Sequence, residues 1–94
     1  MINVVIEAII RKIDYSLSLS QSNIKAFSVA VTEAVNSIPC EPPFVSLWSE
    51  LAGANSRFDF HDINPVVREL ELAREKLAAM LPPEDSEIQE TGST

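Results

Sequence analysis

The chain has 94 residues, a formal net charge of −7, two glycines and one cysteine. A single cysteine cannot form an internal disulfide, which excludes the small secreted disulfide scaffolds. The acidic balance argues against direct nucleic-acid binding, because that binding depends on Lys and Arg residues that neutralise phosphates. A chain of this length forms one domain, which we place at residues 1–83.

The N-terminal stretch MINVVIEAII is apolar, but it does not have the order of a secretory signal. Glu7 interrupts it, and the basic residues Arg11 and Lys12 follow it instead of preceding it. No stretch approaches the roughly 18–20 apolar residues of a membrane span. We therefore expect a soluble, cytoplasmic protein with no membrane partner.

The first predicted helix runs from Ile2 to about Ser16, because apolar residues recur there at spacings of three and four. A strand competes from Val4 to Ile10, since β-branched residues dominate that part. The stripe is wide, so we expect cover on more than one side, from the rest of a bundle or from a second copy that makes a homodimer. The candidate oligomer interface comprises Val5, Ile6, Ile9, Ile10 and Ile13.

A serine-rich stretch, residues 16–22, predicts a break after this helix, because serine favours caps over helix interiors. Ser18 with Gln21 has the spacing of a capping box, and Ser20 is an alternative cap. A second helix is expected from about Gln21 to Ile38. Its apolar seam repeats at three and four residues: Ile24, Phe27, Val31, Ala34 and Ile38.

Prolines end this second helix at Pro39 and prepare a short third one. Pro43 suits the first turn of a short helix that we expect at residues 44–52, and Gly53 suits the position just after its end. Residues 54–63 are irregular, with a short extended piece where Phe58 and Phe60 alternate with polar residues.

A last helix is predicted from Asn64, as its N-cap, to about Leu81, with Pro65 at the first helical position. Its apolar seam is Val66, Leu70, Ala73, Leu77 and Met80, and we expect the seams around Ile9, Val31 and Leu77 to converge in one core. On the surface of this helix, Arg68–Glu71 and Glu71–Arg74 have the spacing of weak ion pairs. Residues 84–94 carry four acids, no base and one large apolar residue, so we expect a disordered acidic tail. Removing its four acids takes the net charge from −7 to −3.

Chemistry-bearing residues are few. His61 is the only histidine, and zinc needs three or four ligands, so we interpret it as structural or solvated. Glu41 beside Cys40 disfavours a reactive thiolate, and the spacing of Glu69, Glu71 and Glu75 is typical of a solvated helix face. Lys25 is the only base on a candidate recognition helix, which disfavours a helix–turn–helix reader. We expect no catalytic residue, no cofactor and no metal.

Aromatic residues concentrate after the prolines, where four of the six lie within seventeen residues. This cluster is either a satellite core beneath a loop or a surface that receives a partner helix or peptide. On the second interpretation the candidate partner-binding residues are Phe44, Leu47, Trp48, Leu51, Phe58 and Phe60.

Together these patterns predict an all-α antiparallel bundle of three long helices and one short one, with an acidic tail. The predicted function is a non-enzymatic protein–protein interaction module: a small adaptor, a chaperone-like protein or an inhibitor that offers apolar helical surface to an unidentified protein. Two alternatives stay open. One is an acidic nucleic-acid mimic that inhibits a nucleic-acid-binding protein, and the other is a small enzyme or enzyme subunit that uses His61 with Asp62.

Overall fold

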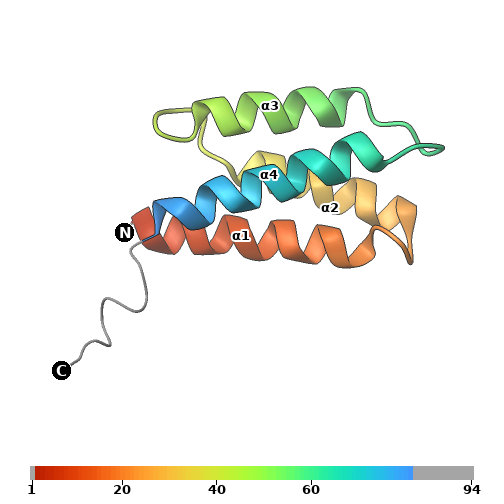
Figure 1. Ribbon diagram of the computed structural model, residues 1–94, viewed down its shortest axis with the longest axis horizontal. Coiled ribbons are helices and arrows are strands. Elements are labelled where there is room, and N and C mark those ends of the chain that lie inside the picture. The colour runs from red at the N-terminus through yellow and green to blue at the C-terminus, as the bar shows by residue number, and fades with distance from the viewer. Residues whose placement is uncertain (1, 82–94) are drawn as a thin grey trace.

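The computed structural model describes residues 2–81 as four helices, with no strand in that range. They are α1 (Ile2–Leu19), α2 (Ile24–Ser37), α3 (Val45–Ser56) and α4 (Asn64–Met80) (Figure 1). The all-α prediction is confirmed. The predicted acidic tail, residues 84–94, lies outside the described residues, as do the last two residues of the expected domain.

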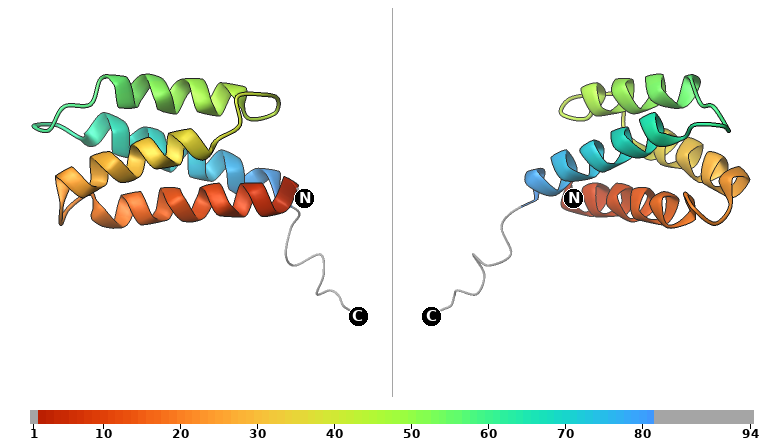
Figure 2. Two further views of the ribbon diagram at one scale, coloured as in Figure 1. Left: turned by 180° about the vertical axis from the view of Figure 1, so that it is seen from behind. Right: turned by 45° about the vertical axis from the view of Figure 1, so that its right-hand side comes forward.

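The four helices form a ring in which each packs against two neighbours. α1 contacts α2 and α4, and α3 contacts the same two helices from the opposite side. Successive helices run antiparallel (Figure 1; Figure 2). The 20–23 turn and the 57–63 loop therefore lie at one end of the bundle. The start of α1, the connection between α2 and α3, and the end of α4 lie at the other.

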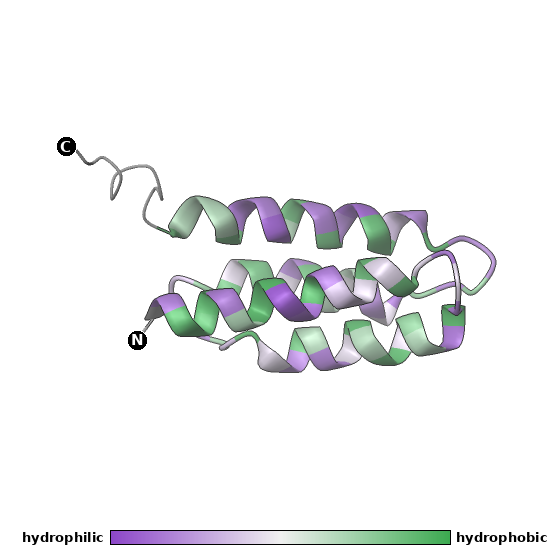
Figure 3. Ribbon diagram, turned by 90° about the horizontal axis from the view of Figure 1, so that it is seen from below, coloured by the Kyte–Doolittle hydropathy of each residue, from purple (hydrophilic) through white to green (hydrophobic). Residues whose placement is uncertain are grey.

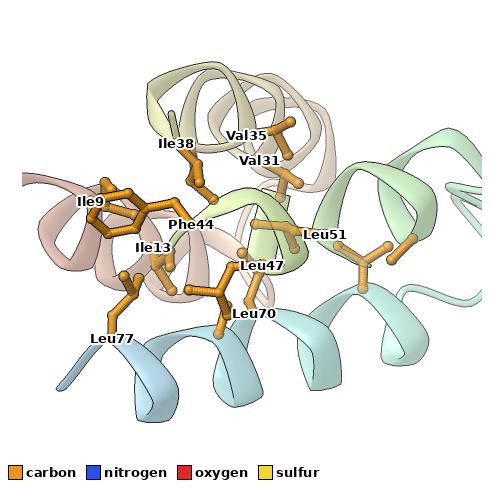
Figure 4. Close-up of a cluster of buried hydrophobic side chains, with 14 of the residues drawn as sticks. Ile9, Ile13, Val31, Val35, Ile38, Phe44, Leu47, Leu51, Leu70 and Leu77 are labelled. Atoms are coloured by element: carbon orange, nitrogen blue, oxygen red, sulfur yellow. The ribbon is translucent and has the colours of Figure 1, made fainter. Parts of the chain in front are cut away.

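One hydrophobic core joins all four helices, and Figure 4 labels ten of its side chains around a common interior. The predicted seams around Ile9, Val31 and Leu77 converge in it. Burying a side chain of this size stabilises the fold by about 1.5–3 kcal/mol relative to leaving it exposed. The buried members are Ile6, Ile9, Ile13, Phe27, Val31, Ala34, Val35, Ile38, Phe44, Leu47, Leu51, Ala54, Val66, Leu70, Ala73 and Leu77.

The predicted break between the first two helices is present but begins later than expected, because α1 continues to Leu19 and the turn occupies residues 20–23. The serines of α1 are compatible with the helix since each hydroxyl donates to a carbonyl one turn earlier. Ser16 donates to the carbonyl oxygen of Lys12 at 2.9 Å, and Ser18 donates to that of Tyr15 at 2.6 Å. Ser16 is also fully buried on the core face. Burying a hydroxyl that is hydrogen-bonded within its own helix costs little free energy. Packing of the apolar stripe therefore keeps the segment helical through its serines.

The predicted caps of the second helix are wrong. Neither Ser18 nor Ser20 caps it, since α2 begins three residues later than expected and its N-cap is Asn23. The Asn23 side-chain oxygen accepts the Ala26 N–H at 3.1 Å, which satisfies one of the free donors of the first turn.

The third helix is longer than predicted and passes through Gly53 to Ser56. Its buried face continues at the same spacing from Leu47 and Leu51 to Ala54. Burial of that additional turn offsets the cost of about 1 kcal/mol of a glycine inside a helix. Phe44, expected as the first residue of this helix, is instead its N-cap.

The fourth helix begins as predicted to within one residue, with Ile63 rather than Asn64 at the N-cap. The Asp62 carboxylate accepts the Asn64 N–H at 3.2 Å, so Asp62 supplies a side-chain acceptor at this helix start. Phe58 and Phe60 lie in a loop with turns, without the extended piece we expected.

Polar contacts join three of the four neighbouring helix pairs. Arg74 on α4 pairs with Asp14 on α1 at 2.7 Å, and Lys76 on α4 pairs with Glu50 on α3 at 3.1 Å. The Asn55 amide on α3 donates to the Thr32 hydroxyl on α2 at 3.2 Å. The hydrogen bond and charge of Asp14 raise the pKa of Arg74 above its ordinary value. The ion pairs predicted along α4 are absent from residues 2–81, since Arg74 pairs with α1 instead.

Candidate protein-interaction surfaces

The aromatic cluster divides between core and surface. Phe44, Leu47 and Leu51 are buried, and Phe44 is only 4% exposed. Trp48 and Phe58 are partly buried and pack against the core. The structure therefore places five of the six candidate partner-binding residues in or against the bundle interior, where a core function accounts for them.

Phe60 is the exception, with 55% of its surface exposed. Its ring lies edge-on to Phe58 at 4.9 Å between centroids, and Phe58 in turn lies 5.9 Å from Phe27 in the core. The loop that carries Phe60 is held by the Asp59 carboxylate, which accepts the His61 N–H at 2.9 Å. Phe60 thus presents one aromatic side chain to solvent at the end of the bundle that holds the 57–63 loop.

The candidate oligomer interface on α1 divides in the same way. Ile6, Ile9 and Ile13 are buried in the core, Ile10 is partly buried, and only Val5 is exposed. The apolar surface of α1 that reaches solvent lies on the opposite side of the helix. There Val4 is 66% exposed and Tyr15 is 60% exposed.

The exposed residues of α1 follow a three–four repeat of their own. Val4, Ala8, Arg11 and Tyr15 are spaced by four, three and four residues, so they share one helix face, and all four are exposed. Val5 and Lys12 flank this row on its α2 side. We call these six residues the α1 outer face. Figure 3 looks onto α1 from outside, between α2 and α4, and shows hydrophobic and hydrophilic segments alternating along it.

The α1 outer face also carries two exposed cations, Arg11 and Lys12. The ion pairs of residues 2–81 engage only Arg74 and Lys76 on α4, so neither cation of the outer face has an acidic partner there. The acidic flank of α1 points towards α4, where Asp14 binds Arg74. The outer face therefore combines apolar anchors with two cations that form no ion pair with the described residues.

Sequence reasoning did not identify Tyr15 as a site residue. Its spacing from Val4 and Ala8 indicates a second apolar face on the helix. The longer apolar stripe that is buried made this second face hard to recognise in the sequence. Which side of a wide apolar helix turns inward depends on the packing of the other helices, and no residue of α1 encodes that alone.

The chemistry-bearing residues are placed apart. His61 and Cys40 are both exposed and lie on connections at opposite ends of the bundle. Between residues 2 and 81, no group of three or more His, Cys, Asp or Glu residues is placed to hold a metal ion. A groove of about 420 Å³ beside the 57–63 loop is lined by residues of both signs: Arg57, Asp59, Asp62, Arg68 and Glu69, with Ala54 and Pro65.

Comparison with known proteins adds no function: no protein family, curated protein or solved structure matches the chain. Within residues 2–81, no helix is both long enough and apolar enough to cross a membrane. We therefore infer the function from the surfaces of the described residues.

Proposed function

We propose that this chain is a non-enzymatic protein–protein interaction module and that the α1 outer face is its binding surface. The supporting observation is the row of Val4, Ala8 and Tyr15, exposed on a helix whose other side is already buried. Exposed tyrosine on a rigid helix is a frequent anchor of protein interfaces, because it buries a large area and loses little conformational entropy.

The partner that fits this face is an amphipathic helix with acidic residues beside its apolar stripe. Helix faces recognise such partners through anchors spaced at three and four residues, which is the spacing of Val4, Ala8 and Tyr15. Acidic groups on the partner would meet Arg11 and Lys12 and set the orientation of binding. This complementarity favours an acidic partner over a basic or a purely apolar one.

The two alternative functions have less support. A nucleic-acid mimic needs a continuous acidic surface, whereas on α1 the exposed acids Glu7 and Asp14 are interrupted by Arg11 and Lys12. An enzyme that uses His61 needs groups that orient and activate the imidazole, and the Asp59 carboxylate accepts the His61 backbone N–H instead. The interaction module is therefore the function we put forward.

Affinity capture from the lysate of the native host tests this proposal with three baits. They are the unmodified chain, the double variant Val4→Ser/Tyr15→Ser, and the control Val29→Ser/Leu72→Ser. The control removes two large hydrophobic side chains of similar exposure from α2 and α4. We expect a partner that is retained by the unmodified chain and the control and lost with Val4→Ser/Tyr15→Ser.

Circular dichroism on all three baits checks that each keeps its helix content, since every substitution is at an exposed position. Retention of the same partner by Val4→Ser/Tyr15→Ser contradicts the proposal. Equal loss with both double variants also contradicts it, because it shows that the interaction is not specific to α1.

A further inference from the structure

The α1 outer face presents charge and apolar surface that the described part of the chain does not cover. Its two cations, Arg11 and Lys12, lie amid exposed apolar residues, and the ion pairs of residues 2–81 do not include them. An occupant that combines acidic groups with an apolar side chain would satisfy both features at once. We therefore look for an acidic segment that covers this face in the absence of a partner. This inference rests on the binding function proposed above.

A second copy of the chain matches this face less well than an acidic segment, because the six residues of the face include two cations and no acid. In a parallel pair, Arg11 would face Arg11 of the other copy. In an antiparallel pair the same flanks of the two helices meet, so Glu7 could pair with Arg11, but Lys12 would meet the flank of the other copy that holds Lys12 and no acid.

An acidic segment of the chain itself starts close to this face. α4 ends at Met80 beside the first turn of α1 in all three views (Figure 1; Figure 2). Residues 82–94 follow, and they contain Glu84, Asp85, Glu87 and Glu90 with no basic residue. The apolar Ile88 stands between the last two of these acids.

The segment is also long enough to reach the whole face. Thirteen residues span at most about 45 Å when extended. The α1 outer face from Val4 to Tyr15 is about 16 Å long, at 1.5 Å per helical residue. The acids near the middle of the segment therefore reach Arg11 and Lys12, which lie about two to three turns along α1.

We propose that residues 82–94 dock on the α1 outer face, with their acids at Arg11 and Lys12 and Ile88 among its apolar residues, and so compete with the partner. A tethered segment acts at an effective concentration in the millimolar range. A contact with an intrinsic dissociation constant of about 0.2–1 mM then weakens partner binding by roughly two- to six-fold. The segment is thereby an internal regulator of the binding surface.

A spin label at the end of the segment tests this contact in the full chain. The variant Cys40→Ser/Thr94→Cys carries one cysteine, since Cys40 is the only natural one and is exposed. Paramagnetic broadening of the Tyr15 amide is compared with that of the Leu72 amide on α4. Leu72 is a matched reference because it is two residues from Arg74, which the ion pair fixes level with Asp14.

We expect the Tyr15 amide to be broadened at least about twice as much as the Leu72 amide. Charge reversal in Arg11→Glu/Lys12→Glu should reduce that ratio to about one, as should high salt. The control Lys25→Glu/Arg57→Glu makes the same change of net charge at two exposed bases away from α1 and should leave the ratio unchanged.

Two results would overturn the inference. One is equal broadening of the two amides in the unmodified background, or a ratio that charge reversal on α1 leaves unchanged. The other is broadening between molecules, which identifies a second copy as the occupant. It is detected by mixing ¹⁵N-labelled chain that carries no spin label with ¹⁴N chain that carries the spin label. Neither measurement involves the partner, so a negative result leaves the proposed binding function to its own test.

Discussion

The two sides of α1 use the same kinds of residue for different purposes. On the inner side, Ile6, Ile9 and Ile13 are buried against the other helices. On the outer side, Val4 and Tyr15 remain in water although they are of similar or larger size. The comparison shows that hydrophobicity alone does not assign a residue to the core, because the two neighbouring helices can cover only one side of α1.

Phe44 and Phe60 make the same contrast within the aromatic cluster, and they give the largest expected difference. Phe44→Ala leaves a cavity in the core and should lower the free energy of unfolding by about 3–5 kcal/mol. Phe60→Ala loses one ring contact and should cost less than about 1.5 kcal/mol. Urea unfolding followed by circular dichroism measures both, and equal costs would mean that the two rings are buried alike.

On α1 itself, Ile13→Ala should lower the free energy of unfolding by about 2–5 kcal/mol, because Ile13 is fully buried. Val4→Ala changes an exposed side chain and should stay within about 0.5 kcal/mol of the unmodified chain. Thermal and urea unfolding of the pair provide the test. A cost above 1 kcal/mol for Val4→Ala would show that Val4 packs as a core residue does, more tightly than the weak docking of residues 82–94 proposed above.

Gly53→Ala should stabilise the chain by about 0.5–1 kcal/mol, because Gly53 lies inside α3 and alanine is the better helix former. A Cβ atom built there is no closer than 3.8 Å to its nearest neighbour, the Arg57 side chain, which is ordinary contact. A rise in the melting temperature checks this. A decrease would mean that α3 ends at Gly53, as its sequence alone had indicated.

The smallest effect is expected at the edge of the α1 outer face, where Asp14 and Arg74 pair in solvent. A double-mutant cycle with Asp14→Asn and Arg74→Gln should give a coupling of less than about 1 kcal/mol, weaker still at high salt. A larger coupling that survives in salt would show that this pair contributes to stability as core residues do.

Much of the fold follows from local patterns. The repeats around Ile9, Val31 and Leu77 predict three helices and a shared core, and Pro65 marks the start of the last helix. The start of the first break at Ser16 and the stop of the third helix at Gly53 were both placed too early, because burial of a whole turn outweighs the weak preferences of single residues.

The candidate site was less predictable for a related reason. Phe44 and Tyr15 are both aromatic residues near helix ends, and nothing in their immediate neighbours distinguishes the buried one from the exposed one. The distinction arises when the four helices pack, since α3 turns Phe44 inward and no helix covers Tyr15. Periodicity identifies the faces of a helix, and tertiary packing decides which face remains free.

The central claim is that the outer side of α1 serves binding while its inner side serves stability. The most direct test measures both properties on Val4→Ser/Tyr15→Ser: the free energy of unfolding in urea and the affinity for the captured partner. We predict an unfolding free energy within about 1 kcal/mol of the unmodified chain and a loss of binding of at least tenfold. Unchanged affinity would contradict the claim, and so would a loss of stability large enough to explain the lost binding.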